Sequence, residues 1–127
     1  MADAQKKILI VEDSESYRFV LSESLREAGF IVAIARNGEE GLDAIKSDKP
    51  DLVLLDITMP KMDGITMSQK LKEEGIKLPI IFLTNMSDIK HVTEATATAT
   101  DYMGYIVKVD TSVDEIVVRV KERFASK

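Results

Sequence analysis

Five short apolar runs recur along the chain, and each is followed by a longer segment in which apolar residues have helical spacing. The runs cover residues 7–11, 30–35, 52–55, 79–84 and 104–107. Such runs, without polar alternation, are typical of strands buried on both faces. Strands that alternate with helices form a parallel sheet with helices on both faces. The sequence therefore predicts an α/β fold of three layers, with a five-stranded parallel sheet and five helices.

Capping signals place several ends of the predicted helices. Ser14 follows the first acidic pair and Gly29 stops the first helix, while Asn37 with Glu40 three residues later opens the second. Ser112 and Glu115 form the same kind of capping box before the last helix. We expect helices over residues 14–28, from 37 to the segment before Pro50, from about 65 to 74 with Gly75 as cap, and from 112 to about 125.

The fourth helix is the least clearly marked. Residues 95–100 read Ala-Thr-Ala-Thr-Ala-Thr, and threonine is a mediocre helix former whose alternation here also resembles a strand. We interpret the segment after Ser87-Asp88 as a helix, because the order of elements requires a crossover there. We expect it to be the least stable helix of the fold.

Length and composition narrow the functional classes. The 127 residues suit one domain over 1–127, with its core from about 7 to 124. The absence of cysteine excludes disulfides and thiolate metal sites, and agrees with a cytoplasmic protein. No apolar stretch approaches the ~20 residues of a membrane span, and the polar start is unlike a signal peptide. A net charge of −5 without a basic cluster argues against direct nucleic-acid binding.

Polar residues follow four of the five predicted strands. Glu12-Asp13 follows the first, Asp56 ends the third, Thr84 ends the fourth and Lys108 follows the fifth. The carboxyl ends of parallel strands meet at one edge of the sheet, where ligands bind in such folds. Three crowded carboxylates repel one another unless a cation neutralises them, and an all-oxygen ligand set suits Mg²⁺. Lys108 and Thr84 add a positive charge and a hydroxyl donor for an anion with tetrahedral oxygens.

The chemistry that this set predicts is phosphoryl transfer to a carboxylate. Asp56 is the expected nucleophile, and the metal with Lys108 would offset charge on the phosphoryl oxygens. Each residue also has a simpler interpretation. Asp56 can cap the next turn, Glu12-Asp13 can favour a helix N-terminus, Lys108 can be a solvated loop residue and Thr84 can simply end a strand. Their convergence on one edge favours the phosphoacceptor site.

The spacing of these residues resembles the receiver domain of two-component response regulators over about residues 7 to 124, here of the stand-alone type. The residues that carry the resemblance are Glu12-Asp13, Asp56, Met59-Pro60, Asp63-Gly64, Thr84 and Lys108. The resemblance implies a flavodoxin-like fold with strand order 2-1-3-4-5. It also implies Mg²⁺ (or Mn²⁺) held by Glu12, Asp13, Asp56 and the backbone carbonyl of Thr58, and a phosphoryl donor that is a sensor histidine kinase or a phosphotransfer protein.

The resemblance further implies a switch rather than an enzyme. Thr84 and Tyr105 would be the switch residues, and the face formed by the fourth helix, fifth strand and fifth helix would bind a downstream protein target. Thr58 and Met86 would flank the approach of water and tune a slow self-dephosphorylation. Tyr105 has the simpler interpretation of strand packing with its hydroxyl at the surface, and the lone His91 is interpreted as a surface residue.

Four positions depart from the family pattern. Val109 follows Lys108 where the family has proline, so a trans peptide is expected. Asp101-Tyr102 replaces a frequent Gly-Ala, and Asn85 stands where a small residue is common. These departures keep open the alternative of a receiver-like interaction module that is not phosphorylated. Two other functions are disfavoured. A phosphatase that uses an aspartyl phosphate would need a carboxylate at position 58, where this chain has Thr58. The acidic turn after residue 11 would repel the phosphate of a flavin cofactor.

Overall fold

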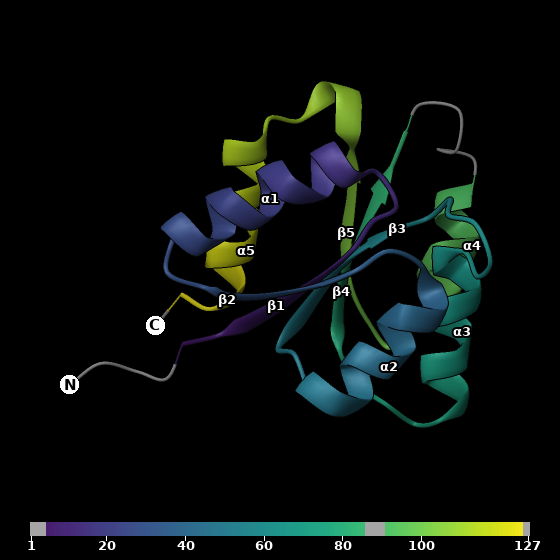
Figure 1. Cartoon of the computed structure of the whole chain (residues 1–127). Helices are drawn as coiled ribbons and strands as arrows, with labels where there is room; N and C mark the ends of the chain where they lie inside the picture. Colours follow the sequence, from purple (N-terminus) through teal and green to yellow (C-terminus); the bar gives the residue numbers. More distant parts are fainter. Residues whose placement is uncertain (1–4, 86–90, 126–127) are drawn as a thin grey trace.

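The computed structural model describes residues 5–85 and 91–125, which form one parallel sheet covered by helices on both faces (Figure 1). The strands lie in the order β2-β1-β3-β4-β5, and every neighbouring pair is parallel. Their bounds are β1 Lys7–Val11, β2 Ile31–Ala35, β3 Leu52–Asp56, β4 Pro79–Thr84 and β5 Asp101–Val107. The three-layer fold and the strand order predicted from the sequence are confirmed.

The α-helices of the described residues divide between the two faces of the sheet. Helices α1 and α5 cover one face, and α2, α3 and α4 cover the other (Figure 1). Their bounds are α1 Glu15–Glu27, α2 Gly38–Asp48, α3 Gly64–Glu73, α4 Val92–Thr98 and α5 Val113–Arg123, with a 3₁₀ turn at Lys108–Asp110 between β5 and α5. Within the part of the chain that is described, no helix combines the length and apolar character needed to cross a membrane.

Successive residues of the central strands belong alternately to two hydrophobic layers, one on each face of the sheet. Leu9, Val11, Val53 and Leu55 belong to the layer under α2, α3 and α4. Their neighbours along the strands, Ile8, Ile10, Leu52 and Leu54, belong to the layer under α1 and α5. All five residues of β3 are buried, as expected for a strand covered on both faces. This double burial brings Asp56, the last residue of β3, to the end of the sheet with little solvent around it.

The predicted caps form. Side-chain oxygens of Ser14 and Asn37 accept hydrogen bonds from the backbone N–H groups of Tyr17 and Glu40. Ser112 makes the complete capping box with its partner three residues on. Helix α3 starts one residue earlier than predicted because the Asp63 side chain caps it, accepting from the N–H of Thr66 at 2.7 Å. These caps fix where the chain leaves each strand end and enters the next helix.

Strand β5 is longer than predicted. The apolar run suggested a start at Gly104, but the strand begins at Asp101, where it pairs with Pro79. A register shift between Ile80 and Phe82 accommodates the extra residue, and Gly104 has a φ of 107° at that irregularity. A β-bulge with a positive-φ glycine breaks the alternation on which the sequence prediction relied.

Two other expectations have clear outcomes, and one cannot be followed. Strand β2 begins at Ile31 rather than Phe30, whereas α4 is a helix as interpreted, seven residues long. The described residues contain no cis peptide bond, so the bond before Val109 is trans as expected. The proposed start of α4 at Ser87-Asp88 lies outside the described residues.

We predict that Gly64→Ala destabilises the fold strongly. A Cβ at this position would clash with the backbone oxygen of Asp56, which cannot move without displacing the end of β3. The expected loss is about 3 kcal/mol in the free energy of unfolding, the upper range for overpacking. Urea denaturation measures it.

Gly29→Ala is the matched control. Gly29 has a φ of 98° but no atom within 4 Å of a built Cβ. Only backbone strain opposes that substitution, so a loss of about 1 kcal/mol is expected. Equal losses for the two variants would show that the contact with Asp56 does not limit residue 64.

Candidate functional site

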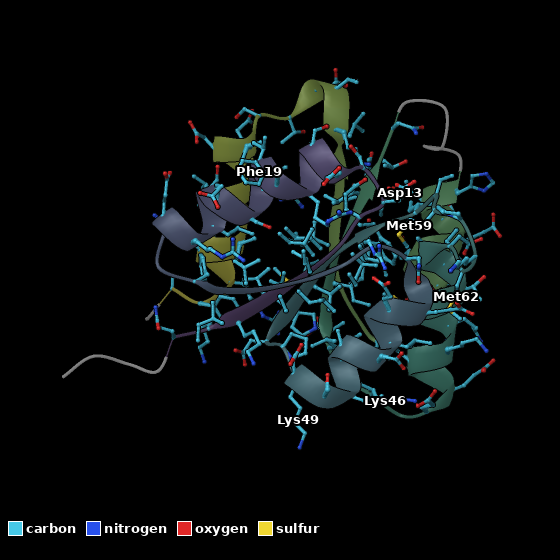
Figure 2. All side chains as sticks on the ribbon, viewed as in Figure 1. Asp13, Phe19, Lys46, Lys49, Met59 and Met62 are labelled. Carbon is cyan, nitrogen blue, oxygen red and sulfur yellow. The ribbon has the colours of Figure 1, made fainter. Side chains whose placement is uncertain are left out.

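Three carboxylates gather where β1 and β3 end. Glu12 and Asp13 directly follow β1, and Asp56 ends β3. Each offers an oxygen that lies within 4.8 Å of the other two. Glu12 is fully buried and Asp56 is 3% exposed, whereas Asp13 is exposed at the edge of the sheet where the strands end (Figure 2). The cluster therefore has a buried side formed by two carboxylates and an open side at Asp13.

Lys108 brings a positive charge into this cluster. Its Nζ lies 2.7 Å from Oε1 of Glu12 and donates a hydrogen bond to Oδ2 of Asp56 at 3.1 Å. The lysine side chain is 18% exposed, so the three charged groups interact largely away from water. Lys108 follows β5 in the 3₁₀ turn, and its ammonium group must reach past the end of β4 to contact Asp56. The predicted convergence of these residues is thus present.

Backbone and side-chain donors orient the two buried carboxylates. The N–H of Ser14 donates to Oε2 of Glu12 at 2.9 Å, and the N–H of Thr58 donates to Oδ1 of Asp56 at 3.3 Å. The buried guanidinium of Arg18 donates to the backbone carbonyl of Glu12 at 2.8 Å, tying α1 to the turn after β1. Each carboxylate is therefore held by one backbone N–H and by Lys108.

Burial and like charge dominate the electrostatics of Asp56. Desolvation, together with the nearby charge of Glu12, raises the pKa of Asp56 from 3.8 to about 8, although Lys108 acts in the opposite direction. Burial by itself lowers the pKa of Lys108, but its hydrogen bond to Glu12 and the charges of Asp56 and Glu12 outweigh that effect and raise it. The site holds one ammonium for three carboxylates and is short of positive charge.

The donor set fits a hard divalent cation. Glu12, Asp13 and Asp56 present carboxylate oxygens within reach of a single ion. A cation there would supply the missing positive charge and favour the ionised form of Asp56. Because Lys108 already contacts Glu12 and Asp56, it would share those carboxylates with the ion.

Thr84 and Thr58 lie at the same edge, and the roles of all the remaining predicted residues stay predictions. Thr84 ends β4 with no exposed surface, and its hydroxyl donates to the carbonyl of Asn85 at 3.0 Å. Tyr105 lies in β5 and is 38% exposed. Thr58 contacts Asp56 through its N–H, while its carbonyl remains the predicted metal ligand. Met86 lies outside the described residues.

Two residues of α1 contribute to the site without having been predicted to do so. Tyr17 packs against the hydrophobic layer under α1 and α5, and its ring centroid lies 5.0 Å from Nζ of Lys108. Arg18 was not assigned at all. The sequence did contain one signal, because Arg18 shares helical spacing with Leu21 and Leu25 on the buried side of the helix. A charged residue in such a stripe requires a partner, here the carbonyl after β1.

The chain is similar to known proteins over most of its length. A family model described as "Response regulator receiver domain" matches residues 8–121. Response regulator MprA of Mycolicibacterium vanbaalenii is 40% identical over 98 residues, which are 76% of this chain and 42% of that protein. The transcriptional regulatory protein PhoP of Bacillus subtilis, named for alkaline phosphatase synthesis, is 42% identical over 79 residues, or 62% of this chain and 33% of that protein.

The fold has close counterparts among solved structures. The chemotaxis protein CheY4 of Vibrio cholerae superposes with a TM-score of 0.83 at 26% identity, covering 94% of this chain and 98% of that chain. The match to MprA and PhoP, in contrast, spans less than half of either curated protein. What those longer proteins do as a whole is therefore separate from what this chain shares with them.

We predict that Asp56→Asn stabilises the metal-free protein in a pH-dependent manner. The pKa of Asp56 is higher in the folded state, about 8, than its ordinary value of 3.8, so the unfolded chain loses this proton first as the pH rises. The stability of the wild type relative to the variant should fall between about pH 4 and pH 8. At pH 8 the variant should be more stable by roughly 1–3 kcal/mol, and near pH 4 the two should be similar.

Thermal unfolding in EDTA across this pH range measures the difference. Asp43→Asn, at an exposed position of α2, is the control and should track the wild type. A constant difference between Asp56→Asn and wild type at all pH values would contradict a raised pKa at Asp56.

Proposed function

Because the chain belongs to the family of response regulator receiver domains, we propose that it accepts a phosphoryl group on Asp56. The observation that carries this proposal is the buried Asp56 carboxylate, with Lys108 Nζ at 3.1 Å and the oxygens of Glu12 and Asp13 within 4.8 Å. A nucleophilic carboxylate needs positive charge around the incoming phosphoryl oxygens. Lys108 and a cation bound by the carboxylates would supply it.

The proposed transfer is a displacement at phosphorus. An oxygen of Asp56 attacks the phosphorus of a phosphohistidine on a sensor histidine kinase or a phosphotransfer protein. The O–P bond forms as the N–P bond breaks, and the imidazole nitrogen leaves with the electron pair and takes up a proton. Lys108, which donates a hydrogen bond to Asp56, would offset charge on the phosphoryl oxygens. The Thr84 hydroxyl would exchange its present bond to Asn85 for one to a phosphoryl oxygen.

Glu12, Asp13, Asp56 and the Thr58 carbonyl would hold the divalent cation, proposed to be Mg²⁺ or Mn²⁺. When bound, such a cation supplies positive charge that neutralises the cluster and the phosphoryl oxygens. Two of the carboxylates are already oriented by backbone N–H groups, so little reorganisation of the protein is needed to bind it.

We propose that the product is a signal. Water would later attack the phosphorus, release phosphate and regenerate Asp56, at a slow rate tuned by Thr58 and Met86. The protein is then a phosphoacceptor that assists its own modification rather than an enzyme acting on a separate substrate. A phosphoryl group that binds better to one conformation shifts the population toward it, and a few kcal/mol suffices.

The proposed readout is the face of α4, β5 and α5, which would bind a downstream protein. Helix α4 has only seven residues, and His91, the N-cap residue that precedes it, makes no side-chain capping bond. Tyr105 pairs with Phe82, two residues before Thr84 on the neighbouring strand, and is partly exposed. A change at Thr84 would therefore arise on the strand that pairs with the proposed switch tyrosine, and the short α4 lies against that same strand β5.

We predict that incubation with acetyl phosphate and Mg²⁺ adds one phosphoryl group to the protein. Asp56→Asn should abolish the gain, because an amide is not a nucleophile at phosphorus, and EDTA should abolish it in the wild type. Asp43→Asn, at an exposed position in the middle of α2, should behave as the wild type. Intact-protein mass spectrometry measures each case.

The same experiment decides between the two candidate functions. A correctly folded wild type that gains no mass at any Mg²⁺ or Mn²⁺ concentration would favour an interaction module that is not phosphorylated. A gain that survives Asp56→Asn would place the acceptor elsewhere.

A further inference from the structure

We propose that Tyr17 is a positioning residue that holds the Lys108 ammonium between Glu12 and Asp56 through the face of its aromatic ring. The role rests on the proposed phosphoryl transfer, in which Lys108 is the group that touches the phosphoryl oxygens. Tyr17 itself would touch neither the substrate nor the metal.

The geometry is that of a cation–π contact. Nζ of Lys108 lies 5.0 Å from the centroid of the Tyr17 ring, inside the ~6 Å range of such contacts. The same nitrogen lies 2.7 Å from Glu12 and 3.1 Å from Asp56. Tyr17 and Lys108 also line one hollow of about 420 Å³ at the surface, beside Ser14, Ser16 and Val20. The ring is therefore a third contact for the ammonium, next to solvent.

The ring, and not the hydroxyl, carries this contact. The Tyr17 hydroxyl oxygen is buried and makes no hydrogen bond within residues 5–85 and 91–125. A buried hydroxyl without a hydrogen-bond partner is destabilising, so the hydroxyl itself does not stabilise this arrangement. Phenylalanine offers the same aromatic face without that penalty, which makes Tyr17→Phe a matched control.

The contact with the Tyr17 ring matters because a divalent cation would compete with Lys108 for its other two partners. Glu12 and Asp56 are the carboxylates that a divalent cation would also use. A lysine held only by them would be displaced toward solvent when the cation binds, since its four-carbon chain is flexible. An aromatic face does not ligate hard cations, so Tyr17 keeps Lys108 at the site when the carboxylates are shared.

The simpler role for Tyr17 is packing. Its side chain also contacts the hydrophobic layer under α1 and α5. A packing role predicts effects on stability that are independent of Lys108, whereas a positioning role predicts effects that appear at Lys108 and vanish when Lys108 is replaced. Experiments on Tyr17→Phe, Tyr17→Leu and Tyr17→Met separate the two, and the use of both aliphatic variants guards against one that fails to fold.

The first measurement follows Lys108 directly. Protons over an aromatic face are shielded, so the ε-methylene resonance of Lys108 should be shifted upfield in ¹³C-lysine-labelled wild type, assigned with Lys108→Arg. The shift should persist in Tyr17→Phe and disappear in the Leu and Met variants. A Lys108 resonance that is unaffected by loss of the ring overturns the proposal, whether or not the protein is phosphorylated.

The second measurement is the rate of phosphorylation by acetyl phosphate at saturating Mg²⁺. The Leu and Met variants should be slower by about 3- to 30-fold, the range expected from a cation–π contact, and Tyr17→Phe should match the wild type. In a Lys108→Met background, Tyr17→Leu should add no further loss. A full additional loss in that background would show packing and overturn the positioning role.

These outcomes separate this inference from the proposed function. If the wild type is phosphorylated and the Leu, Met and Phe variants react at one rate, the positioning role fails and the function stands. If the wild type is not phosphorylated, the function fails, and the Lys108 resonance alone decides whether Tyr17 holds the ammonium.

Discussion

The contact of Lys108 with two buried carboxylates is the interaction on which the architecture of this protein depends. Asp56 and Glu12 are almost fully removed from water, and a buried charge without a partner is strongly destabilising. Lys108 reaches them from beyond β5, across the end of β4. Three strands must therefore end at matching heights for the charges to meet. Asp56 pairs with Leu83, and Leu83 pairs with Ile106, which places Lys108 two residues beyond that level.

The register of the strands is therefore coupled to the charge contacts at their ends. A slip of one residue in β3 would exchange its two side-chain faces, moving Asp56 and sending every leucine of the strand to the opposite layer. Uniform burial of β3 does not prevent this, because both layers are apolar. The polar groups at the strand ends do, since only one register satisfies Asp56 with Lys108 and with the N–H of Thr58. The site thus specifies the register of the sheet that presents it.

The site still lacks positive charge after these contacts form. Burial and the nearby charge of Glu12 raise the pKa of Asp56, which disfavours the ionised, nucleophilic carboxylate in the absence of a cation. In the proposed function this shortage of positive charge favours cation binding. The three crowded carboxylates repel one another, and a bound cation reduces that repulsion. The predicted instability of the metal-free site and the proposed reactivity have the same physical origin.

Which features the sequence predicts depends on whether they are local. The order of strands and helices, the caps at Ser14 and Ser112, and the gathering of Glu12, Asp56 and Lys108 follow from short patterns and from the geometry of parallel sheets. The start of β5 does not, because it depends on a bulge at Gly104 opposite β4. Nor does the contact of Tyr17 with Lys108, which joins α1 to the turn after β5 and needs the helix to be rotated correctly on the sheet.

Contacts between distant segments also distinguish the two helices of the proposed output face, α4 and α5. Arg119 of α5 donates to the carbonyls of Met103 and Tyr105, and Arg123 pairs with Asp101, so α5 is fastened along β5. Helix α4 has no comparable pair of guanidinium contacts to β5 among the described residues, and its threonine hydroxyls bond within the helix instead. Moving α5 would break several charge-assisted bonds to the strand that carries Tyr105. The described residues of α4 make none to that strand and receive one from α3, where Lys72 donates to the carbonyl of Ala97. Any rearrangement of this face should therefore fall on α4.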